Sequence, residues 1–105
     1  MVLQLNLSGN ELCGLDNDGG GTYNAEGITA IADALRVNGS LTKMSLAQNE
    51  LEEEGTKAIC EALEQNTTLK DLDIMGWSGS NIGGPAGAKH VAKMLGVNGS
   101  LKKME

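Results

Sequence analysis

Aromatic residues are almost missing from this 105-residue chain, which has no phenylalanine, one tyrosine and one tryptophan. A hydrophobic core must therefore be built from aliphatic side chains, although compact globules often place aromatic rings at their centre. The length suits one domain, residues 1–105, with a single core. The shortage of aromatics favours a thin core that is layered along one axis.

Basic residues are also scarce, with eight lysines and arginines against 14 acidic residues and a formal net charge of -6. Binding to nucleic-acid phosphates needs clustered lysine and arginine, and the one arginine here is Arg36. A nucleic-acid partner is therefore not expected. We interpret the acidity as a contribution to solubility rather than as the mark of a specific basic partner.

No run of apolar residues is long enough to cross a membrane, so membrane insertion is not expected. The first residues alternate apolar and polar side chains, which is not the pattern of a signal peptide. Two cysteines are too few for a disulfide scaffold. We expect Cys60 at a core position of a helix, Cys13 as a candidate exposed thiol, and both reduced in a cytoplasmic protein.

Three stretches of the chain align without gaps, each running 14 positions from a glycine to a leucine. They begin at Gly27, Gly55 and Gly87 and end at Leu41, Leu69 and Leu101. Apolar residues recur at three matched positions: Ile31, Ile59 and Val91; Ala32, Cys60 and Ala92; Leu35, Leu63 and Leu95. This spacing marks one face of a helix and predicts three helices.

A segment of alternating polarity precedes each of these stretches. The clearest contains Met44 and Leu46, and its period of two predicts a short strand with one buried face. The chain thus divides into repeats at about 2–40, 41–68 and 69–100, with a partial fourth from 101. A strand and a helix cannot bury their own apolar faces, so we expect the repeats to stack into a solenoid.

The pattern Leu41-x-x-Met-x-Leu-x-x-Asn49-x-Leu51, followed by Gly55 and Ala62-Leu63-x-x-Asn66, resembles the ribonuclease-inhibitor-like leucine-rich repeat. The resemblance covers essentially the whole chain. It implies an α/β solenoid in a horseshoe arc, with parallel strands on the concave face and helices on the convex face. It further implies a non-catalytic scaffold or protein-binding module, although this fold serves many kinds of partner.

The resemblance also implies structural roles for recurring small and amide residues. Asn10 and Asn49 should satisfy backbone groups at the turn after each strand, a position that Asn81 or Ser80 fills in the third repeat. The three matched glycines should permit close packing at the helix starts. Asparagines just past the helices are expected in left-handed cap geometry, at Asn38, Asn66 and Asn98.

Solvent-facing strand positions form rows across the predicted concave surface. The rows are Gln4, Lys43, Asp71 and Lys103; Asn6, Ser45, Asp73 and Glu105; and Ser8, Ala47 and Met75. We take Lys43, Asp71, Asp73 and Met75 as candidate partner-binding residues. The alternative for the first row is that neighbouring strands simply pair their opposite charges.

Two insertions interrupt the repeat on one rim, at 13–24 and 75–81. Trp77 lies in the second, and tryptophan is favoured at interface hot spots. Tyr23 supports a weaker version of the same prediction. The alternative is that each ring folds back over its own repeat.

Chemistry at a metal or an active site is not expected. Residues 16–21 resemble the opening of a calcium loop, but glycine occupies two positions that need oxygen ligands. His90 is the only histidine, so neither a zinc cluster nor a histidine-based catalytic group is predicted. We expect a protein that is not an enzyme and holds no cofactor.

Apolar residues at both ends of the array lack a polar cap, at Val2, Leu5, Leu7, Leu101 and Met104. They predict self-association through the ends, or a piece of a longer array. Two alternative functions remain open. One is a regulator of a GTPase or of another enzyme, since Ran GTPase-activating proteins use a similar repeat. Arg36 is on a helix rather than a rim loop, so it is not a candidate arginine finger. The other is a small structural subunit of a larger assembly.

Overall fold

Short strands with one buried face assemble into a parallel sheet. The computed structural model spans residues 1–105 and describes all of them except 1–2, 15–20, 22, 75–80, 100 and 105. Within the described residues the strands are β1 (Leu3–Asn6), β2 (Leu41–Ser45), β3 (Asp71–Asp73) and β4 (Lys103–Met104). They lie in the order β1-β2-β3-β4, and each neighbouring pair is parallel.

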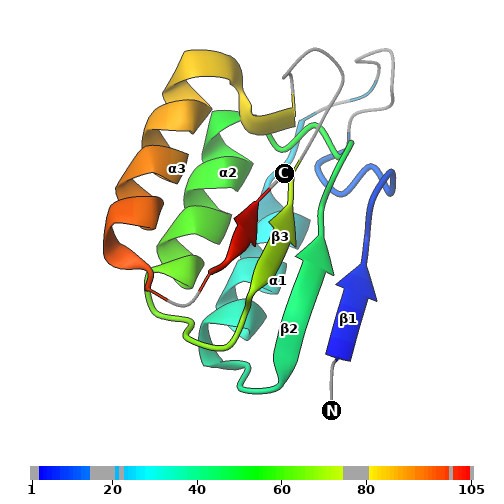
Figure 1. Ribbon diagram of the computed structural model, residues 1–105. Coiled ribbons are helices and arrows are strands. Elements are labelled where there is room, and N and C mark those ends of the chain that lie inside the picture. Colours follow the sequence, from blue (N-terminus) through cyan, green and yellow to red (C-terminus); the bar gives the residue numbers. More distant parts are fainter. Residues whose placement is uncertain (1–2, 15–20, 22, 75–80, 100, 105) are drawn as a thin grey trace.

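Helices connect the strands and cover one face of the sheet. They are α1 (Glu26–Val37), α2 (Glu52–Leu63) and α3 (Gly84–Val97). Figure 1 shows them side by side behind the strands, with α2 between α1 and α3. Three consecutive glutamates in the first turn of α2 favour its start, because the helix N-terminus carries partial positive charge. The described part of the chain is therefore an α/β fold with a four-stranded parallel sheet and three helices.

The core lies between the sheet and the helix layer and is aliphatic, as the composition predicts. Met44 and Leu72 point from the strands into it and are 2% exposed. Ile28, Ile59 and Met94 fill it from the helices. Among the described residues, no helix has the length and apolarity needed to span a bilayer.

Buried side-chain amides occupy the turns that follow β2 and β3. The Oδ1 of Asn49 accepts hydrogen bonds from the backbone N–H of Asn10 (2.9 Å) and Leu12 (3.2 Å). Its Nδ2 donates to the carbonyl oxygen of Leu7 (2.8 Å) and to that of Leu46 (3.1 Å). The expected role of Asn49 is confirmed, and the amide ties β2 to the turn after β1.

Asn81, rather than Ser80, takes the same place one layer further on. Its Oδ1 accepts from the N–H of Asn49 (3.0 Å) and Leu51 (3.1 Å). Its Nδ2 donates to Leu46 (3.1 Å) and Ile74 (2.9 Å). Asn49 and Asn81 are both at most 1% exposed, so these bonds satisfy polar groups that water does not reach.

A second set of asparagines lies past the helices, and the predicted left-handed cap geometry is wrong there. Asn38 and Asn98 have extended backbones, with φ of -75° and -78°. Their Oδ1 atoms accept from the N–H of Leu41 and Leu101, each at 2.7 Å, and turn the chain into the next strand. Because the side-chain oxygen stabilises this turn, the backbone does not have to adopt a left-handed conformation.

This second set also joins neighbouring layers. The Nδ2 of Asn66 donates to the carbonyls of Leu35 (2.8 Å) and Asn38 (3.1 Å). The Nδ2 of Asn98 donates in the same way to Leu63 and Asn66. Each amide thus reaches back to the preceding strand–helix unit.

Close packing at the helix starts explains the matched glycines. A methyl group at Gly87 would lie 1.5 Å from the carbonyl oxygen of Ile82. At Gly55 it would lie 3.2 Å from the Cβ of Leu51. The prediction that glycine permits close packing at the helix starts is confirmed at these two positions.

The two cysteines are free and buried, and the candidate exposed thiol at Cys13 is wrong. Cys13 is fully buried as a member of the core cluster. Burial raises the pKa of its thiol, and a hydrogen bond with Tyr23 opposes the rise. Cys60 lies in the core of α2, as expected, and burial together with Glu64 and Glu61 raises its pKa to about 12.

Removal of the Asn49 amide should weaken the fold strongly. Asn49→Ala leaves several buried backbone groups without a partner, at a cost of about 1–3 kcal/mol each when unsatisfied. We expect the free energy of unfolding in urea to fall by about 3 kcal/mol. Asn10→Ala, at the exposed matched position, should cost less than about 1 kcal/mol. Equal losses for the two variants would contradict the role of the buried amide.

The turn after β1 needs a left-handed residue, which Gly9 supplies with a φ of 67°. Gln48 holds the matched position after β2 with a φ of 57°. Gly9→Ala should lower the free energy of unfolding by about 1 kcal/mol through backbone strain alone, since a Cβ there meets nothing within 4 Å. Gly39→Ala is the control, because that site is equally open and its φ is not in the strained range. A loss in both variants would rule out strain as the cause.

Stability should decline in alkaline solution because of Cys60. Its folded-state pKa of about 12 lies above the 9.0 of an unperturbed thiol. The stabilisation of the neutral thiol is therefore complete below pH 9 and is lost as the pH rises toward 12. The test variant is Cys60→Ala, because alanine occupies the matched positions of the other two helices, Ala32 and Ala92. As the pH rises from 9 to 11, the unfolding free energy of this variant should fall by less than that of the natural chain. The difference between the two losses should be on the order of 2 kcal/mol at pH 11. Parallel pH profiles would contradict this assignment.

Candidate binding surface

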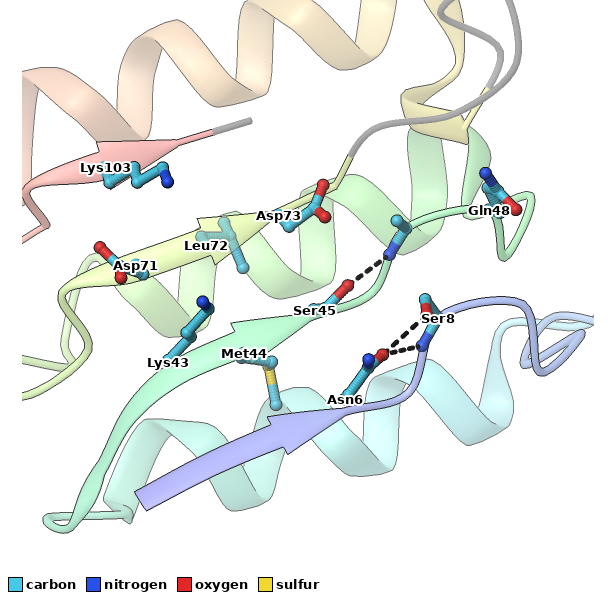
Figure 2. Close-up of a pocket in the computed structure, with 11 residues that line it drawn as sticks. Asn6, Ser8, Lys43, Met44, Ser45, Gln48, Asp71, Leu72, Asp73 and Lys103 are labelled. Carbon is cyan, nitrogen blue, oxygen red and sulfur yellow. Dashed lines mark hydrogen bonds between the residues drawn. The ribbon is translucent and has the colours of Figure 1, made fainter. Parts of the chain in front are cut away.

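The face of the sheet opposite the helices is open and carries a shallow hollow of about 390 Å³. Figure 2 shows side chains from β1, β2, β3 and β4 gathered around it, with the helices behind. Its lining residues are Asn6, Ser8, Lys43, Met44, Ser45, Ala47, Gln48, Asp71, Leu72, Asp73 and Lys103. Most are polar or charged, so this face is built for contact with solvent or with a polar partner.

Register places charged residues beside one another across this surface. Gln4 pairs with Lys43, Lys43 with Asp71, and Asp71 with Lys103. The first predicted row is therefore confirmed. It contains one lysine on each side of an aspartate, so neighbouring strands place opposite charges next to each other.

The second row runs through Asn6, Ser45 and Asp73, which also pair in register. The Oδ1 of Asn6 accepts from the backbone N–H (2.9 Å) and hydroxyl (2.7 Å) of Ser8. Asp73 follows Asp71 on the same face of β3, so that strand contributes two half-buried carboxylates to the hollow. The surface thus offers cations and anions on adjacent strands.

An apolar floor supports these polar side chains. Met44 and Leu72 border the hollow but turn into the core, as Figure 2 shows. Because both are packed against the helix layer, the strands that carry Lys43, Asp71 and Asp73 are held in fixed positions. The open face is therefore presented by a rigid support.

Sequence reasoning missed Gln48 as part of this surface. It is exposed at the rim, on the turn that Asn49 fixes from inside. Its place directly before the turn asparagine that follows the second strand is the signal that identifies such a residue.

Tyr23 contributes to internal packing in this structure. Its hydroxyl donates to the carbonyl oxygen of Leu51 and accepts from the N–H of Gly55 (3.1 Å). Burial, followed by the nearby Cys13, raises the pKa of this phenol. The ring is half-buried against the core, and its hydroxyl bonds to the next unit rather than folding over its own. Its contact with a partner stays a prediction.

Three predicted surface residues, Met75, Trp77 and Glu105, lie outside the described residues, as does most of the Asp16–Gly21 loop. Within the part of the chain that the structure describes, no three histidine, cysteine, aspartate or glutamate side chains gather as a metal site would need. His90 is partly exposed on α3, and its Nε2 lies 3.1 Å from the Oε2 of Glu53 on α2. This contact joins two helices on the side of the molecule away from the hollow.

A scan against models of known protein families finds no match for this chain, and a search of curated proteins finds none either. No relative therefore assigns a role to the residues of the open face.

Proposed function

We propose that this protein is a non-catalytic binding module of the leucine-rich-repeat type, which recognises another protein through the open face of its sheet. The observation that carries the proposal is the polar hollow on that face, lined by Lys43, Asp71 and Asp73. The helices cover the opposite face, so the sheet offers a single surface for a partner.

The mixture of charges on the hollow indicates what kind of partner it suits. Lys43 and Lys103 offer ammonium groups, and Asp71 and Asp73 between them offer carboxylates. A nucleic acid would be repelled by the aspartates, whereas a protein segment that carries residues of both signs can complement them. We therefore expect a protein partner with alternating charge.

Several features support a solenoid of stacked repeats as the scaffold. The strands follow sequence order across the sheet, and the helices do so across the second layer. Asn49 and Asn81 join consecutive units on one side of the core, and Asn66 and Asn98 join them on the other. A cytoplasmic setting for this scaffold agrees with its two buried free thiols.

Charge reversal on the hollow tests the proposed function. Peptides that bind the natural chain are selected from a displayed library of random sequences, synthesised with a fluorophore and titrated by fluorescence anisotropy. Lys43→Glu and Asp71→Lys should each weaken binding at least tenfold for most selected peptides, about 1.4 kcal/mol in binding free energy. The direction follows from the loss of complementary charge on the surface.

Lys57→Glu is the matched control, because it makes the same change on the exposed side of α2. It should leave the affinities within a factor of two. Selected peptides that bind all variants equally, or a library that yields no binder, would contradict binding through this face.

A structural subunit of a larger assembly is the second candidate. It is favoured by apolar side chains of α3 that are exposed, Leu95 (48%) and Val97 (58%). These lie at the edge of the helix layer, away from the hollow.

A further inference from the structure

The outer side of α3 exposes positions that the other helices bury. Leu35 and Leu63 are 2% and 0% exposed, whereas Leu95 at the matched position is 48% exposed. Ala32 and Cys60 are buried, whereas Ala92 is exposed. α1 and α2 are each followed by a helix that packs against them in the layer, whereas no described helix follows α3. The outer side of α3 therefore has the shape and apolarity of a surface that receives a helix of the same kind.

The opposite edge of the molecule shows the converse pattern. Ala62 of α2 and Met94 of α3 are fully buried, whereas Ala34 at the matched position of α1 is exposed. In the sheet, Leu5 is 39% exposed, whereas Met44 and Leu72 at the next registers are 2% exposed. The α1–β1 edge thus has the residues by which α2 and α3 dock onto the preceding unit. We name these two surfaces the α3–β4 edge and the α1–β1 edge, and Figure 1 shows them at opposite ends of the layers.

Hydrogen-bonding groups at the two edges are complementary as well. Asn66 and Asn98 donate their side-chain N–H groups to the carbonyls of Leu35 and Leu63 in the preceding unit. By the same register, Asn38 of a docked copy would reach the carbonyl of Leu95. β1 and β4 are the two outer strands of a parallel sheet. If β1 of a docked copy lay beside β4, it would continue the sheet in the same direction.

Charge favours this arrangement over pairing of identical edges. Residues 1–40 contain five acidic residues and one arginine, whereas residues 84–105 contain four lysines and one glutamate. The first unit is therefore acidic and the last is basic. Two like edges would repel each other, whereas unlike edges attract.

From these observations we infer that a second copy of this chain docks head to tail, its α1–β1 edge against the α3–β4 edge of the first. This association is heterologous, so it extends to chains of molecules or closes into a ring. It is independent of the proposed function of the open face, because it uses neither Lys43 nor Asp71.

Sedimentation velocity of the 105-residue chain over a wide concentration range tests the inference. We expect the weight-average mass to rise beyond that of a dimer with concentration, and to fall as added salt screens the opposite charges. Leu95→Glu and Ala34→Glu each place a carboxylate on one edge, at sites already exposed to solvent, so the fold should persist by circular dichroism. Each variant alone should be monomeric where the natural chain associates.

Mixing the two variants gives the decisive measurement. Leu95→Glu keeps an intact α1–β1 edge and Ala34→Glu keeps an intact α3–β4 edge, so together they should form a one-to-one dimer and nothing larger. Val37→Gln is the control. Val37 is 84% exposed, and the matched residue of α2 is the exposed Gln65, so association should be unchanged.

Three outcomes would overturn the inference. A natural chain that is monomeric at every concentration would leave these edges to a different polypeptide or to solvent. Association that survives Ala34→Glu but not Leu95→Glu would mean that two α3 faces meet. A mixture of the variants that stays monomeric would exclude the head-to-tail contact.

Discussion

Side-chain amides buried at the ends of the core are the interaction on which this fold depends. A strand that turns into a helix inside the protein exposes backbone N–H and carbonyl groups, and these cost free energy if they meet neither water nor a partner. Asn49 and Asn81 meet that need with bonds to two successive turns. Short strands that end in tight turns over a buried core therefore depend on such internal partners.

The same arrangement leaves one face of the sheet unconstrained. Helices and amides fix the inward residues, such as Met44 and Leu72, whose burial decides stability. The outward residues of the same strands do not pack against the helix layer, so burial in the core does not fix their residue types. This is why Lys43 and Asp71 can stand in register on a rigid support and define a surface without disturbing the core.

Much of the architecture could be predicted because it is encoded locally and recurs. Alternation at Met44 and Leu46 identifies a strand, and alignment of the three matched stretches fixes the register of the charged row. Cys13 could not be placed, because it follows the first turn in a segment without periodicity, and its burial depends on contacts made by distant residues such as Tyr23. The caps at Asn38 and Asn98 were mispredicted for a related reason. Asparagine after a helix suggests a left-handed backbone. Here the side chain of each asparagine bonds to the start of the following strand, and the backbone is extended instead.

Burial of a recurring residue depends on its neighbours as well as on its own unit. Leu35, Leu63 and Leu95 occupy one position of the pattern, yet the last differs in exposure because no helix of the described chain lies beyond α3. The amides also have a direction, since Asn66 and Asn98 both donate to the unit before them. A layer built in this way has two different edges, one that offers amide donors and one that offers carbonyl acceptors. The edge with amide donors is satisfied only by the edge with carbonyl acceptors. The direction of the hydrogen bonds inside the molecule therefore also sets the head-to-tail direction of any association that continues the layers.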